Sequence, residues 1–134
     1  MHSVISELSN SRAPAWLDEG LAQYLEGEIN SRVGPGLRNW LKKSDPIKLG
    51  HMHDGFLDFD HGTVPAAYGQ SLFATRTLIN SNGMDSLVKY LRMLGKNISH
   101  EMAFERAFKK TTIEFETGLK RQLNLWSKSS QVTP

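Results

Sequence analysis

Apolar residues recur along this chain at spacings of three and four residues, and strict alternation of apolar and polar residues is almost absent. That spacing gathers apolar side chains on one face of an α-helix, whereas a half-buried strand needs alternation. We therefore expect an all-α protein of about six helices. The 134 residues suit a single domain, and the absence of cysteine excludes a disulfide framework, a thiolate metal site and a cysteine nucleophile.

Proline, glycine and capping residues indicate where the helices begin and end. Pro14 suits the first position of a helix because its missing N–H has no partner there. A break is expected at 33–36, which reads Val-Gly-Pro-Gly, and a long loop over 46–63, which has no helical period. The expected helical segments are 1–10, 14–29, 37–44, 64–82, 84–94, 99–108 and 111–126. They form one domain over 1–127, followed by a frayed tail at 128–134.

Charge and hydropathy limit the expected partners. The first thirty residues hold one arginine and five carboxylates, and the basic excess elsewhere is dilute, so we expect no nucleic-acid partner. No apolar run approaches the ~18 residues that span a bilayer, so we expect no membrane contact within this chain. The cellular compartment is not predicted.

The most specific stretch is 14–27, which contains Glu19. On a helical wheel Glu19 lies about 160–200° from Leu17 and Leu21, the residues expected to face the core. By geometry alone Glu19 and His2 are ordinary solvated side chains, because polar residues are mostly exposed.

The stretch nevertheless resembles the third-ligand helix of gluzincin zinc metallopeptidases, most closely the bacterial peptidase-MA-like domains. The run Trp-Leu-Asp-Glu-Gly-Leu-Ala at 16–22, with Pro14 before it and Tyr24 after it, is similar to the pattern that follows HExxH in that family. The resemblance implies that Glu19 binds zinc and that His2 stands where the second histidine of HExxH belongs. Ala-Tyr-Gly-Gln-Ser at 67–71 is similar to the family's Ala-Tyr-x-x-Ser, which implies that Tyr68 stabilises the developing oxyanion.

The resemblance implies zinc as cofactor and a peptide or protein as substrate. Catalytic zinc takes about three protein ligands and lowers the pKa of its bound water towards ~7. The first histidine of HExxH and its base glutamate would precede His2 and are not among these residues. We therefore expect a fragment of a metallopeptidase, inactive as it stands. The alternative is a non-catalytic helical interaction module that retains the peptidase fold.

The loop at 50–62 concentrates potential ligands. It contains three histidines and three aspartates, which is compatible with a metal site, with a mobile polar loop and with a cleft-lining segment that shapes specificity. Relative to the family the loop lies where substrate clefts are lined. We therefore expect His53 and His61 to contact substrate, together with Gln23 near the Glu19 face of its helix.

Overall fold

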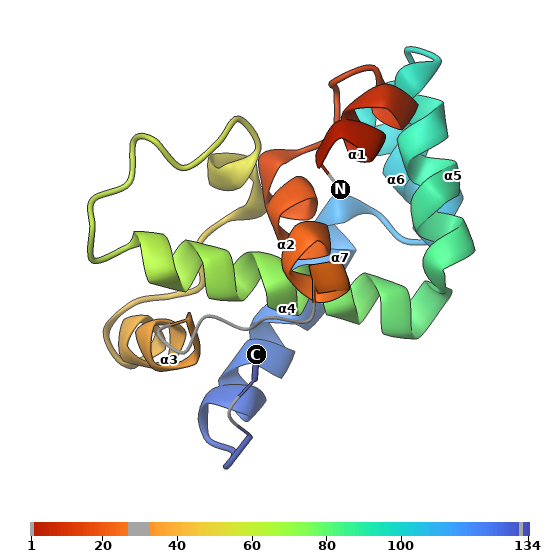
Figure 1. Ribbon diagram of the computed structural model, residues 1–134. Helices are drawn as coiled ribbons and strands as arrows, with labels where there is room; N and C mark the ends of the chain where they lie inside the picture. The colour runs from red at the N-terminus through yellow and green to blue at the C-terminus, as the bar shows by residue number, and fades with distance from the viewer. Residues whose placement is uncertain (1, 27–32, 132) are drawn as a thin grey trace.

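The computed structural model describes residues 2–26, 33–131 and 133–134 (Figure 1). These residues contain helices and no strand, which confirms the expected all-α fold. The elements are α1 (His2–Ser9), α2 (Ala15–Glu26), α3 (Val33–Lys43), the short 3-10 helix η1 (Leu49–Met52), α4 (Val64–Asn82), α5 (Met84–Gly95), α6 (His100–Phe108) and α7 (Thr112–Ser127).

Helix α4 is the scaffold of the molecule. It runs through the middle of the fold, and α2, α3, α5 and α7 all contact it (Figure 1). One cluster of buried apolar side chains includes residues from every one of these α-helices, from Ile5 in α1 to Trp126 in α7. Burial of that cluster is the main stabilising contribution expected for a chain of this size without disulfides.

Helix α2 crosses α4 at a very short distance because residue 20 is glycine. A Cβ atom on Gly20 would lie 2.1 Å from Thr75 Oγ1 and 2.3 Å from the backbone oxygen of Ser71. The two helix backbones could not approach so closely around any side chain. The crossing fixes the orientation of α2, which carries Glu19.

Several predicted helix ends are confirmed. Ser99 caps α6 by accepting a hydrogen bond from Met102 N, and Thr111 and Glu114 form the capping box of α7. Gly83 ends α4 with a φ of 85°. The predicted apolar face of α7 is buried as expected, and it consists of Phe115, Leu119, Leu123 and Trp126.

The expected break at 33–36 is wrong, because α3 already begins at Val33. Pro35 falls in the first turn of this helix, where backbone N–H groups have no intrahelical partner. The missing N–H of the proline therefore costs no hydrogen bond. The stripe expected on α2 is only half right: Leu17 and Leu21 are buried, whereas Tyr24 and Leu25 are 36% and 44% exposed. The last residues of the expected helix, 27–29, lie outside the described residues.

Gly95 plays a different part from the expected one. It does not stop α5 from outside but is its last residue, and a Cβ there would lie 2.3 Å from the backbone oxygen of Leu8. The positive φ after this helix belongs to Asn97. Gly95 therefore permits close packing of α1 on α5.

The loop at 46–63 contains no α-helix, as expected, and extends away from the helices on one side (Figure 1). Its start is held by Gln70, which is buried and pairs through its side chain with both the N–H and the C=O of Ile47. Phe56 and Phe59 pack partly against the core, while Leu57 is fully exposed.

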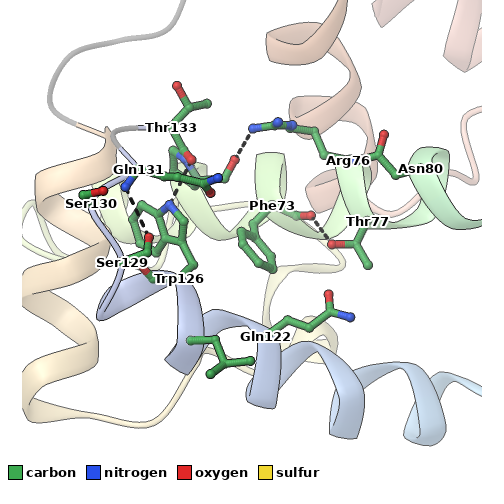
Figure 2. A pocket seen from close by; sticks show the side chains of 12 residues that line it. Phe73, Arg76, Thr77, Asn80, Gln122, Trp126, Ser129, Ser130, Gln131 and Thr133 are labelled. Atoms are coloured by element: carbon green, nitrogen blue, oxygen red, sulfur yellow. Dashed lines mark hydrogen bonds between the residues drawn. The ribbon is translucent and has the colours of Figure 1, made fainter.

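The segment after α7 lies against α3 and α4. Arg38 donates hydrogen bonds to the carbonyl oxygens of Ser129, at 3.1 Å, and Gln131, and its guanidinium lies 4.2 Å from the centre of the Trp126 ring. The indole N–H of Trp126 donates to the Thr133 carbonyl at 2.9 Å (Figure 2). The fraying expected for residues 128–134 stays a prediction.

None of the helices in the described ranges combines the length and the hydropathy that crossing a bilayer requires.

Candidate functional site

Two of the predicted site residues meet where α2 crosses α4. The side-chain amide of Gln23 donates a hydrogen bond of 3.0 Å to the backbone oxygen of Tyr68. Glu19 lies one helical turn before Gln23 on α2 and is half-buried. The structure thus brings Gln23 and Tyr68 together and places Glu19 beside them along the helix.

The short α2–α4 crossing supports this arrangement. The Ser71 hydroxyl donates to the Ala67 carbonyl at 2.8 Å within α4, and the Ser71 backbone oxygen faces the space left by Gly20. The buried Thr75 hydroxyl, which has no hydrogen-bond partner within the part of the chain that is described, lies at the same point. At Gly20 and Ser71 the two helices therefore pack backbone against backbone.

The ring of Tyr68 is half-buried beneath the loop. The Phe56 ring meets it edge to face, with 5.2 Å between ring centres, and Phe56 also contacts Phe59. The exposed part of Tyr68 leaves its ring accessible to a ligand, while Phe56 restricts how it can turn.

His53 and His61 have different surroundings. The backbone oxygen of His53 accepts a hydrogen bond of 2.8 Å from Ala15 N, at the start of α2. His61 is exposed and follows Asp60, whose pKa is held below its ordinary value by hydrogen bonds from Thr63. His53 is therefore tied to the helix that carries Glu19, and His61 lies three residues before α4 begins.

The structure adds two residues that the sequence did not indicate, His100 and Tyr90. The His53 and His100 rings lie 5.4 Å apart at 73°, and His100 Nδ1 lies 2.5 Å from the Tyr90 hydroxyl. A cavity of about 440 Å³ is lined by His53, His100, Trp16, Phe104 and neighbouring polar residues, and a second of about 400 Å³ shares both histidines. No spacing in the sequence connects these residues, because they come from three separate segments.

Of the two expected zinc ligands, His2 and Glu19, only Glu19 has a described side chain. The backbone of His2 lies in α1, one helix before Glu19, but its side chain lies outside the described residues. Among the side chains that are described, no group of three or more histidine, aspartate or glutamate residues could hold a metal ion. This holds for the loop at 50–62 as well, so the described side chains do not by themselves make a zinc site.

A further hollow, of about 640 Å³, lies between α4 and α7 and contains none of the predicted site residues (Figure 2). Phe73 and Trp126 form its apolar part, and Arg76 donates to the Pro134 carbonyl at its rim.

Comparison of the chain with models of protein families, with curated proteins and with solved structures found no match. The resemblance to gluzincin peptidases therefore depends on the residues of the two stretches, 14–27 and 67–71.

Proposed function

We propose that these helices are part of a zinc-dependent metallopeptidase domain that hydrolyses peptide bonds. The observation that carries the proposal is the meeting of the two stretches that resemble the family. They lie more than forty residues apart in sequence, yet Gly20 seats against Ser71 and Gln23 binds the Tyr68 carbonyl. A chance likeness in one stretch would not require the other to lie beside it.

Each residue has a defined task in this proposal. Zinc, when bound, lowers the pKa of a coordinated water towards ~7. Glu19 supplies a carboxylate ligand, and His2 and a residue outside the described set complete the ligands. The phenol of Tyr68 donates a hydrogen bond to the oxyanion that forms on the substrate, an effect on the order of 3 kcal/mol where such a donor has been removed. Gln23 positions Tyr68 through its backbone, and His53 and His61 are proposed to contact the peptide.

Zinc binding tests the proposal directly. The protein should be produced with the codons that precede His2, of which the fourth and third are expected to encode histidine and glutamate. We expect about one tightly held zinc ion per chain. Glu19→Gln should weaken zinc affinity at least about tenfold, as loss of even an outer partner of a ligand does. Glu26→Gln, on the exposed end of the same helix, should leave affinity unchanged.

Tyr68 requires a separate measurement. In the extended protein Tyr68→Phe should lower kcat about 100-fold or more, with the zinc content unchanged. The 134-residue chain itself should show no chelator-sensitive hydrolysis, and such hydrolysis would contradict the role given to the upstream residues. Absence of bound zinc in the extended protein would favour the alternative, a helical interaction module that retains the fold.

A further inference from the structure

The two histidines that line both cavities also join three segments of the fold. The His53 ring lies against the His100 ring at the start of α6, while the His53 backbone oxygen bonds Ala15 N at the start of α2. Ala15 is in the first turn of α2, where N–H groups have no intrahelical acceptor. Contact between the rings therefore helps to keep the His53 carbonyl in place as the acceptor for Ala15 N, in the first turn of the helix that carries Glu19.

This contact favours a neutral His100 ring for two reasons. Burial and the nearby His53 lower the pKa of His100, the buried surroundings being the larger cause. His100 is the first residue of α6, where the helix dipole disfavours positive charge. Burial also raises the pKa of Tyr90, so its hydroxyl keeps its proton and shares a hydrogen bond with His100 Nδ1.

We propose that His53 and His100 form a pH-sensitive latch, which releases residues 49–54 from the start of α2 when the medium is acidified. Imidazole rings change charge between about pH 5 and pH 8, so the latch would work in a physiological range. Two charged rings in contact repel, and a protonated His100 keeps its hydrogen bond with the Tyr90 hydroxyl only where that hydroxyl acts as the acceptor. The ring of His53 then moves away, and its carbonyl leaves Ala15 N.

Other charged groups near the pair oppose or assist this release. Glu101 on α6 favours a charged His100, but its effect is the smallest of those acting on the ring. The remaining charged neighbours around the two cavities are Asp54 of the loop, Asp18 of α2, Arg12 of the α1–α2 turn and Glu116 of α7. Asp54 is exposed and therefore screened by water. Burial of His100 therefore decides that its pKa is lowered rather than raised.

The lowered pKa of His100 makes the folded protein less stable as the pH falls. Below the pKa of an unperturbed histidine, about 6.5, the unfolded chain binds a proton more readily than folded His100 does. The contribution of the neutral ring is therefore complete above about pH 6.5 and is lost as the pH falls towards the lower folded value. The latch is closed at neutral pH and opens in acid.

Hydrogen exchange at the Ala15 amide measures the latch. The protection factor, corrected for the intrinsic rate at each pH, should fall at least about tenfold between about pH 7.5 and about pH 5. His53→Gln keeps the backbone carbonyl but removes the imidazole that lies against His100, so the fall should be smaller than in the wild type. His61→Gln, exposed in the same loop, should show the same fall in Ala15 protection as the wild type. A protection factor of Ala15 that is independent of pH in the wild type overturns the proposal without any variant.

A ring titration followed by NMR gives the second test. The titration midpoint of His100 should rise when His53 is replaced by glutamine, because a like-charged neighbour is removed. An unchanged midpoint, or an equal loss of Ala15 protection in His53→Gln and in the wild type, would show that the two rings do not act together.

Discussion

At the scale of single residues, Gly20 controls the α2–α4 crossing more directly than any larger side chain does. The atoms that a Cβ would meet include a backbone oxygen, which cannot turn aside as a flexible side chain can. The predicted site residues Glu19 and Gln23 stand on either side of this contact. A change at position 20 therefore acts on the site through the distance between two helices.

Gly20→Ala should lower the free energy of unfolding by about 1–3 kcal/mol, the usual cost of overpacking, although alanine favours a helix over glycine. Urea denaturation monitored by tryptophan fluorescence measures the change. Gly118→Ala is the matched control, since Gly118 lies within α7 with open space where its Cβ would go. It should stabilise the protein by about 0.5–1 kcal/mol. Equal effects of the two variants would show that the crossing is not tight.

At the scale of elements, α7 shows how local chemistry sets a helix boundary. Thr111 accepts a hydrogen bond from Glu114 N at 3.1 Å, and the Glu114 carboxylate accepts one from Thr111 N at 3.0 Å. Hydrogen bonds from Thr111, first from its backbone N–H and then from its side chain, lower the pKa of Glu114. The stability that the charged form supplies is present above the ordinary pKa of 4.5 and is lost as the pH falls through the lowered folded value.

Thr111→Ala should lower the free energy of unfolding by about 1 kcal/mol, the typical value of an N-cap. The acid-induced loss of stability below about pH 4.5 should become somewhat shallower, because the Glu114 carboxylate loses the Thr111 hydroxyl and keeps the backbone N–H of residue 111. Denaturant unfolding at several pH values tests both expectations. Thr117→Ala, exposed in the middle of the same helix, should change stability by less than about 0.5 kcal/mol.

Helix type and most helix ends could be predicted from the sequence because they depend on neighbouring residues. Ser99, Gly83 and the capping box act within four residues of themselves. The exposure of Tyr24 and the role of Gly95 could not be predicted, since each depends on which distant helix lies alongside.

The same division applies to the candidate site. Gln23 and Tyr68 were each indicated by the sequence, but the hydrogen bond between them could not be predicted, because it depends on how α2 crosses α4. His100 and Tyr90 were missed because a histidine at the start of a helix and a tyrosine ten residues earlier carry no motif. Only the packing of α6 on α5, and of the His53 ring against the His100 ring, brings them to His53.

At the scale of the whole molecule, Arg38 connects α3 to the end of the chain described here. It stacks on the Trp126 ring and binds carbonyl oxygens of the following segment, so one side chain holds two elements far apart in sequence. Stacking of this kind contributes about 0.5–1 kcal/mol at a partly exposed site.

Arg38→Met should lower the free energy of unfolding by about 1 kcal/mol and speed amide exchange over 128–131 at least about tenfold. Exchange followed by mass spectrometry resolves this segment. Arg121→Met, exposed on α7, should leave the exchange of the segment unchanged. If residues 128–131 exchange without protection in the wild type, the frayed tail predicted from the sequence is right and Arg38 does not restrain it.

The packing of α1 on α5 has a consequence for the order of synthesis. Ile5 is buried, the Leu8 carbonyl lies close to Gly95, and Arg12 binds the Leu94 carbonyl, so α1 packs mainly against residues made more than eighty positions later. As the chain leaves the ribosome, α1 must therefore keep part of its apolar face uncovered until α5 has emerged. Translation through α5 is the step that buries this face.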